Sequence, residues 1–232
     1  MESSEPFELA GSVRPQTYGR ERADRIQQPV VEPLWLGLRV IVAASADAVT
    51  IFDDGTPIDE QVRIAARLQR MLAHTADGVI LDGYLTKQVS ADDIPAVISG
   101  DVIPSASQLA TKALVGIRRD RKAEELKKLQ AAEAAQTFAP DDLLNLVVVD
   151  LLWLDGEWLL DVPLLERKRL LEAVIPGDDL VRSGPYVQPP YNTWIGSWRS
   201  QGFGGLTFKE ANSRYRPGEV SRDWTVTDLP RR

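Results

Sequence analysis

Hydrophobic and polar positions alternate along much of the chain in runs that are short enough for β-strands. Residues 38–44 and 48–52 are two such runs around a polar turn, and an Asp-Asp-Gly sequence closes the second. Together they predict a β-hairpin. Residues 78–85 predict a further strand that is broken by a glycine, and residues 146–154 form the nearly continuous apolar run of a central strand.

Other segments have the periodicity or the composition of helices. Apolar positions recur at near-helical spacing in residues 59–74, where Asp59 supplies an N-terminal signal. Residues 105–136 are rich in Ala, Leu, Lys and Glu, so residues 118–136 predict a long exposed helix. Residues 163–174 open with a proline and carry apolar side chains on one face, so we expect this helix to pack on the preceding strand.

The order of these elements predicts the fold class. Strands and helices follow one another without a regular βαβ rhythm, and no internal repeat is visible. An α+β fold with antiparallel sheets flanked by helices is therefore expected. Residues 1–30 lack a sustained period and predict an N-terminal arm that is either laid over the domain or mobile, and residues 31–232 form the domain itself.

Composition narrows the class of protein. The chain has no cysteine, which excludes disulfides, thiolate nucleophiles and cysteine-containing zinc sites. The first residues lack a basic flank followed by an apolar run, and no apolar stretch is long enough for a membrane span. These features disfavour secretion and membrane insertion, and they favour a cytoplasmic protein.

Charge is unevenly distributed. The net charge is −7, which is the wrong sign for binding nucleic acid by overall electrostatics. Residues 182–222, however, hold six basic against two acidic side chains, and residues 104–139 hold seven against four. Two interpretations remain open, a basic binding face and an ordinary solvated surface.

Several short motifs keep the order and spacing of one known family. They are EPLWLGLR at 32–39, LDGY at 81–84, DLLWLDG at 150–156, PLLERKRLL at 163–171, GGLTFK at 204–209 and SRYRPGEVSRDW at 213–224. Over about residues 30–228 this series resembles the adenylation (nucleotidyltransferase) domain of ATP-dependent DNA ligases. The resemblance implies an ATP-grasp-like fold of antiparallel sheets. Because the chain stops shortly after the last motif, we expect no OB-fold domain.

The position of the family's nucleophile is occupied by a hydrocarbon. In the family, the lysine of the first motif attacks the α-phosphate of ATP, and the AMP then passes to the 5′-phosphate of nicked DNA. The aligned residue here is Leu34, which has no lone pair to donate. The resemblance therefore assigns no catalytic residue, and Leu34 and Leu36 are expected to pack in the core of the former nucleotide cleft.

Other positions that the family uses for ATP and metal also differ. Tyr84 stands for a glutamate that holds ribose, and Val149 stands for the aromatic ring that stacks on adenine. Gly204 replaces the metal-associated glutamate, and Val226 and Asp228 replace the lysines that neutralise phosphate charge. The family implies ATP and Mg²⁺ as cofactors, whereas these replacements argue against both and predict no metal site.

Some charged family positions persist. Arg39, Asp82 and Lys209 are candidates for contacting a nucleotide or another phosphate. For Arg39 and Lys209 a structural ion pair is the alternative.

The arginines of residues 213–222 are the candidates for DNA contact. The resemblance places this loop near DNA, which makes Arg214, Arg216 and Arg222 candidate phosphate contacts, and a solvated loop is the alternative. Trp194 and Trp198 are four residues apart on one helix face and are expected in the core or at an interface rather than on a base-stacking platform.

These observations lead to one function and two alternatives. The leading hypothesis is a catalytically degenerate, ligase-like protein without adenylation activity, which binds nucleic acid or a partner protein in DNA repair, recombination or replication. The first alternative is an active ligase in which Lys87 or Lys209 has taken over as nucleophile. The second is a structural or assembly protein that docks a partner through the emptied cleft or the 118–136 helix.

Overall fold

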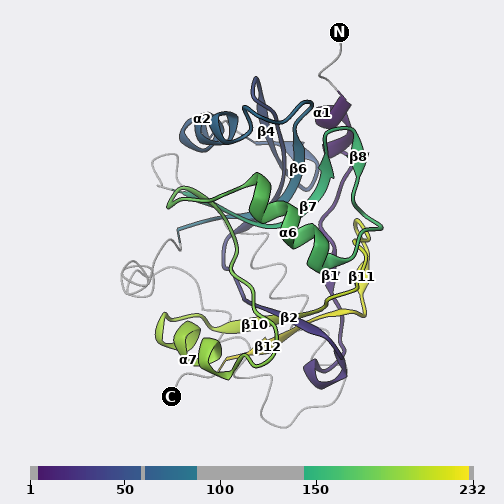
Figure 1. Cartoon of the computed structure of the whole chain (residues 1–232), viewed down its shortest axis with the longest axis vertical. Helices are drawn as coiled ribbons and strands as arrows, with labels where there is room; N and C mark the ends of the chain where they lie inside the picture. The colour runs from purple at the N-terminus through teal and green to yellow at the C-terminus, as the bar shows by residue number, and fades with distance from the viewer. Residues whose placement is uncertain (1–4, 59–60, 88–143, 230–232) are drawn as a thin grey trace.

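The computed structural model describes residues 5–58, 61–87 and 144–229, which form two antiparallel sheets with helices around them (Figure 1). The large sheet has the strand order β5-β4-β3-β6-β7-β8, and β9 pairs in parallel with β7. Its strands are β3 (Leu38–Ala44), β4 (Val49–Asp53), β5 (Thr56–Pro57), β6 (Val79–Thr86), β7 (Asn145–Leu154), β8 (Glu157–Trp158) and β9 (Val181–Ser183).

The small sheet lies below the large one in Figure 1 and has the order β12-β10-β2. Its strands are β2 (Pro29–Pro33), β10 (Gly205–Glu210) and β12 (Trp224–Asp228). Beside it, β1 (Thr17–Tyr18) and β11 (Val220–Ser221) form a short parallel pair. Antiparallel pairing dominates both sheets, so the expected α+β class is confirmed.

Helices cover the sheets on both sides. They are α1 (Glu5–Ala10), α2 (Val62–Met71), α6 (Leu164–Val174) and α7 (Asn192–Ser200), together with a 3-10 turn at Ala23–Arg25. Helix α2 buries Ile64, Ala65, Leu68 and Met71 against one face of the large sheet. Helix α1 packs on the opposite face, where Ala10 is fully buried.

Most predicted elements in the described part of the chain are confirmed. The hairpin is β3–β4, with Asp54 and Gly55 at positive φ in its following turn, and the segments at 78–85 and 146–154 are β6 and β7. Strand β6 continues through its glycine with a shift of register between Asp82 and Gly83. Asp59 and the helix expected at 118–136 lie outside the described residues. In the 1–30 segment the structure has α1, β1, the 3-10 turn and the start of β2, and Ala10, Val13 and Tyr18 are buried in the core.

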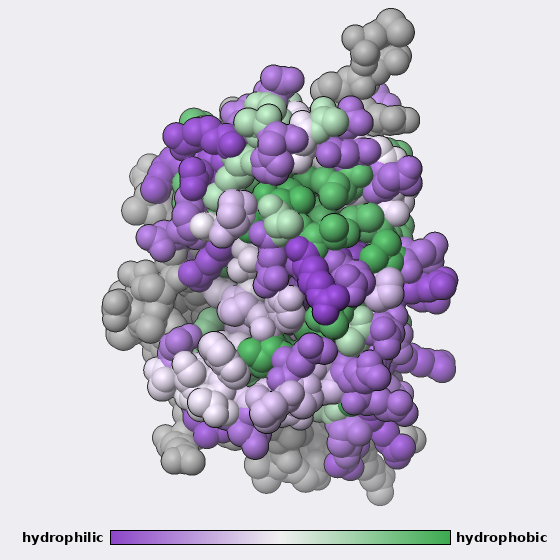
Figure 2. All heavy atoms as spheres, viewed as in Figure 1, coloured by the Kyte–Doolittle hydropathy of each residue, from purple (hydrophilic) through white to green (hydrophobic). Residues whose placement is uncertain are grey.

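Helix α6 differs from the prediction that its apolar side chains share one buried face. It buries Arg167 and Lys168 almost completely, whereas Leu170 is 37% exposed. Figure 2 shows hydrophobic residues gathered on the molecular surface in the region of α6. The basic side chains of α6 are buried because acidic side chains on β7 and β2 face this helix and form ion pairs with them.

The buried apolar residues form three clusters. One lies under α2 on one face of the large sheet, and a second lies on the other face beneath α1. The third joins the large sheet to the small sheet and α7, and we call it the inter-sheet cluster. Its buried members are Ile26, Val31, Trp35, Tyr84, Val147, Val149, Trp198, Phe203, Leu206, Phe208 and Leu229.

Candidate functional site

Three of the motif segments meet at one end of the small sheet. The backbone N–H of Leu34, just after β2, donates to the carbonyl oxygen of Gly205 at 2.9 Å. Gly205 on β10 pairs with Asp228 on β12, and the N–H of Leu229 donates to the carbonyl oxygen of Gly204 at 2.9 Å. The folded chain therefore brings together the positions that the resemblance assigns to the nucleophile, the metal carboxylate and the phosphate lysines.

The large sheet supplies two further motif positions. Tyr84 on β6 pairs with Val147 on β7, and Val149 lies two residues farther along β7. Tyr84 and Val149 are 1% and 2% exposed, and both belong to the inter-sheet cluster. The positions that the family uses for ribose and adenine therefore face apolar side chains from the small sheet.

Leu34 fills space directly above the backbone of β10. Its side chain is 3% exposed, and a Cβ atom placed on Gly205 would lie 2.9 Å from Leu34 Cδ2. Core packing of Leu34 is confirmed, whereas Leu36 is only half-buried, and its carbonyl oxygen accepts a hydrogen bond from Thr86 Oγ1 at 2.6 Å. A Cβ atom at position 205 would therefore require the Leu34 side chain to shift.

Aromatic rings close the neighbouring part of the cluster. Trp35 meets Phe203 edge to face with ring centroids 5.1 Å apart, and the guanidinium carbon of Arg182 lies 5.3 Å from the Trp35 ring centroid. Trp198 is 3% exposed, whereas Trp194 on the same helix is 51% exposed, with ring centroids 6.3 Å apart. The expected core role holds for Trp198, and Trp194 lies at the surface.

The structure brings Arg39 and Asp82 together. Arg39 donates two hydrogen bonds to the Asp82 carboxylate, at 3.0 and 2.7 Å, and the hydroxyl of Tyr215 donates a third at 2.8 Å. Burial lowers the pKa of Arg39, but the Asp82 charge outweighs it and raises that pKa well above the usual value. Burial and the same carboxylate raise the pKa of Tyr215. These groups satisfy one another inside the protein, as the ion-pair alternative for Arg39 expects.

Lys209 lies apart from that pair, in a buried triad that we call the Glu32 triad. Lys209 Nζ is 2.8 Å from one Glu32 carboxylate oxygen, and Lys168 Nζ is 2.5 Å from the other. All three side chains are at most 3% exposed, and Lys209 Nζ also lies 4.5 Å from the Trp224 ring centroid. The triad joins β2, β10 and α6 and contains one more positive than negative charge.

Protonation in the Glu32 triad follows from burial and charge. Burial raises the pKa of Glu32, but Lys168 and Lys209 outweigh it, so this pKa lies below its usual value of 4.5. Burial lowers the pKa of Lys168, and the attraction of Glu32 offsets this only in part. Sequence reasoning gave Glu32 and Lys168 no role, although both lie within the motifs at 32–39 and 163–171, because pairing between distant elements has no local signal.

A second ion pair anchors α6 on β7. Arg167 donates to both oxygens of Asp150 at 2.8 Å, and both side chains are fully buried. Arg167 also donates to the carbonyl oxygens of Val162 and Ser213. The spacing of the sequence did not reveal this pair either, and its geometry explains why the basic residues of α6 face inward.

The candidate DNA contacts are exposed. Arg214, Arg216 and Arg222 all lie at the surface, and Arg214 forms an ion pair with the exposed Asp161 at 3.0 Å. Gly19, which follows β1, packs on the backbone of residues 221–222. The exposed Glu219 and Asp223 lie in the same loop, so its charge is mixed.

The described residues place limits on other kinds of site. Among them no group of three or more His, Asp or Glu side chains is arranged to hold a metal ion. His74 is exposed just beyond α2. Within the same part of the chain, every helix is too short or too polar to cross a bilayer.

Solved structures of DNA ligases share this fold. The chain is similar to a mycobacterial DNA ligase D complexed with ATP and MES, with 21% identity, a TM-score of 0.65, and coverage of 94% of this chain and 60% of that chain. The ligase domain of M. tuberculosis LigD gives 20% identity, a TM-score of 0.63 and the same coverage. The bacteriophage T7 ATP-dependent DNA ligase in complex with ATP gives 15% identity, a TM-score of 0.51, and coverage of 95% of this chain and 69% of that chain.

The chain thus spans about 60% of the length of the two mycobacterial ligase structures. Comparison with curated protein sequences returns no match. The family model of the ATP dependent DNA ligase domain matches residues 20–225, which is most of the chain. Fold, motif order and this match agree, and the chain therefore belongs to the ATP-dependent DNA ligase domain family.

Proposed function

We propose that this protein is a member of the ligase family that does not adenylate itself and that acts by binding nucleic acid. The observation that carries the proposal is the inter-sheet cluster. At the positions where the family holds its nucleotide, buried hydrocarbon and aromatic side chains pack against one another. Leu34, at the position of the nucleophile, is buried against Gly205 of β10, the strand that contributes Leu206 and Phe208 to this cluster.

The residues at this site do not fit ATP and Mg²⁺. Phosphate groups and divalent cations need charged or strongly polar side chains around them. Placing them among apolar side chains costs free energy, because their hydration is lost without replacement. Gly204 and Val226 offer no such groups, and a carboxylate at Asp228 would repel phosphate. The basic side chains at the two family positions Arg39 and Lys209 are engaged in ion pairs.

The position of Lys209 argues against the alternative in which this lysine has become the nucleophile. This residue lies four positions along β10 from Gly205, a rise of about 13 Å in an extended strand. Its ammonium group is buried and held by Glu32 at 2.8 Å. Lys87 is half-buried and directly follows Thr86, whose hydroxyl contacts the loop after Leu34. Of these two lysines, Lys87 is therefore the one whose modification is worth testing.

Thermal unfolding with and without ATP and Mg²⁺ tests whether the packed ligase-like site binds a nucleotide. A ligand that binds only the folded protein raises its stability by about 2.7 kcal/mol at a concentration one hundred times its Kd. The proposal predicts no shift in Tm at millimolar ATP and Mg²⁺, alongside an active ligase whose Tm rises. A saturable rise in the Tm of this protein would contradict it.

Nucleic-acid binding is supported by ancestry and by the exposed arginines of the 213–222 loop. We expect a fluorescent nicked duplex to bind with an affinity that falls as salt rises, because phosphate contacts release counterions. The double substitution R216Q/R222Q should weaken binding and reduce the slope of log K against log salt by about 2. The matched control is R63Q, which removes an exposed arginine from α2. Equal binding by the R216Q/R222Q and R63Q proteins would refute this part of the proposal.

A further inference from the structure

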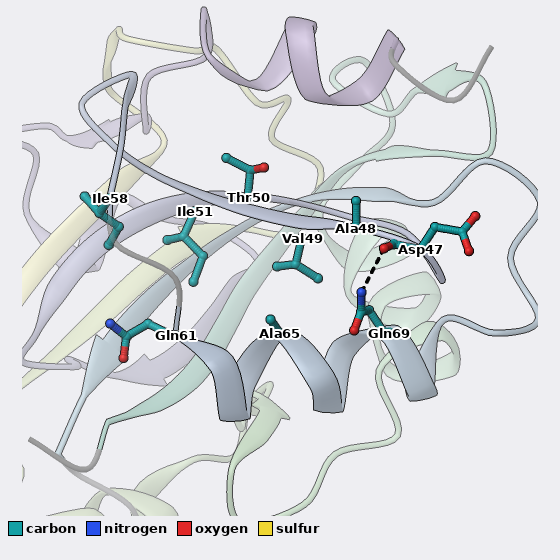
Figure 3. A pocket seen from close by; sticks show the side chains of 9 residues that line it. All are labelled: Asp47, Ala48, Val49, Thr50, Ile51, Ile58, Gln61, Ala65 and Gln69. Atoms are coloured by element: carbon teal, nitrogen blue, oxygen red, sulfur yellow. Dashed lines mark hydrogen bonds between the residues drawn. The ribbon is translucent and has the colours of Figure 1, made fainter. Parts of the chain in front are cut away.

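A groove lies between the edge of the large sheet and α2. Its volume is about 420 Å³, which lies within the range of ligand sites in proteins. Figure 3 shows Val49 and Ile51 pointing from β4 toward α2, where Ala65 faces them, and Ile58 at one end. These side chains give the groove an apolar floor. Helix α2 covers the opposite face of the large sheet from the inter-sheet cluster, so the groove is separate from the ligase-like site.

The backbone of β4 presents hydrogen-bonding groups along this groove. The N–H of Ser45 donates to the carbonyl oxygen of Ala48 at 2.8 Å, which fixes the alternation of the β3–β4 hairpin. By that alternation, Val49 and Ile51 direct their N–H and C=O groups away from β3. The carbonyl oxygen of Ile51 accepts the N–H of Ile58 at 3.0 Å, as this direction requires.

The remaining part of this edge is uncovered within the described part of the chain. Strand β5 pairs only with Phe52 and Asp53 of β4. Both backbone groups of Val49 and the N–H of Ile51 therefore face the groove with no neighbouring strand among the described residues. An open strand edge of this kind is a template for another strand.

Polar side chains mark the two ends of the groove. Gln61 lies at the end near Ile58 (Figure 3). At the other end Gln69 Nε2 donates to the backbone carbonyl oxygen of Asp47 at 2.9 Å. Asp47 supplies the one charge among the residues that line the groove, and its side chain is exposed. A ligand with a basic group at this end is complementary to it.

We propose that this groove binds an extended peptide segment of a partner protein, which adds as a strand to β4 beside Val49 and Ile51. An apolar ligand would leave the strand edge unpaired, whereas a peptide backbone satisfies it. Alternate side chains of the peptide point onto the apolar floor and are small and β-branched, and a lysine or arginine lies beside Asp47. The proposal places a protein partner at a defined strand edge. It does not depend on whether the ligase-like site on the other face of the large sheet binds a nucleotide or DNA.

The probe is an acetylated and amidated heptapeptide of sequence Lys-Thr-Val-Thr-Val-Thr-Lys, titrated into the full ¹⁵N-labelled chain. We expect saturable changes in the amide resonances of Val49 and Ile51. The V49P substitution removes the N–H of residue 49, which points away from β3, and leaves the hydrogen bonds between β3 and β4 in place. Loss of this one hydrogen bond should weaken peptide binding about tenfold. V49T keeps the N–H and the side-chain shape, and should bind like the unchanged protein. D47N should weaken binding severalfold.

Hydrogen exchange on the free protein gives a second and independent measurement. The amides of Val49 and Ile51 should exchange faster than those of Thr50 and Phe52, which pair with β3. Protection of all four amides in the free protein would show that another part of the chain already covers the edge, and would overturn the proposal. It is equally overturned if the peptide produces no saturable shift at Val49 and Ile51, or if V49P and V49T bind it with the same affinity.

Discussion

The Glu32 triad makes the strongest prediction about stability. Replacing Glu32 by glutamine keeps the size of the side chain but leaves two buried ammonium groups at the positions that now lie 2.5 and 2.8 Å from its carboxylate. Removing one partner of a buried ion pair costs about 3–5 kcal/mol. For a domain of this length each kcal/mol lowers Tm by roughly 2–4 °C. The expected fall in Tm for E32Q is therefore roughly 6–20 °C.

The substitution K168M is the matched control, because it acts on the same triad and leaves Glu32 and Lys209 as an ion pair whose charges cancel. Burial already lowers the pKa of Lys168, so its charge is held at a cost. A replacement of similar volume should cost less than about 1.5 kcal/mol. Urea unfolding followed by tryptophan fluorescence measures both variants and the double variant E32Q/K168M, which should be more stable than E32Q. If E32Q is no less stable than K168M, the triad does not hold α6 on the small sheet as argued.

Further predictions concern packing and pH. G205A should destabilise the protein by about 1–3 kcal/mol because its new Cβ would meet Leu34, and combining it with L34A should cost less in urea unfolding than the two separate losses added together. W198A should cost about 3–5 kcal/mol and W194A less than about 1 kcal/mol, because only the first ring is buried; equal losses would contradict the placement of α7. The pKa of Glu32 is lowered on folding, so its contribution is present above pH 4.5 and is lost as pH falls through the folded value. The difference in unfolding free energy between the unchanged protein and E32Q should therefore shrink in that acidic window.

Local patterns predicted the main strands of the large sheet and two helices, because each has its own signal, but they did not predict the small sheet. The β3–β4 hairpin, β6 and β7 follow from short apolar runs and α2 follows from helical spacing, and their observed bounds are close to the predicted ones. Helix α6 was predicted in position but not in orientation. Its residues Arg167 and Lys168 are turned inward by Asp150 and Glu32, which lie on other elements and leave no trace in the spacing of the helix itself.

The candidate site could be predicted only in part, because motifs locate segments of the chain but do not give the contacts between distant segments. Motif order located the segments that meet around Leu34, but it could not say that Tyr84, Val149 and Trp35 pack into one apolar cluster. Nor could it pair Arg39 with Asp82, or Lys209 with Glu32, because these contacts join strands far apart in the sequence. The groove at β4 was not predicted, since it depends on which backbone groups the neighbouring strand leaves uncovered.

The most direct test of the central claim is the intact mass of the purified protein after incubation with ATP and Mg²⁺ or Mn²⁺, beside an active ligase of the same family. The account predicts an unchanged mass for this protein and an AMP adduct on the control, because Leu34 provides no nucleophile and its side chain is buried. An added mass of one AMP would contradict the account. Peptide mapping would then identify the modified lysine, with Lys87 as the first position to examine.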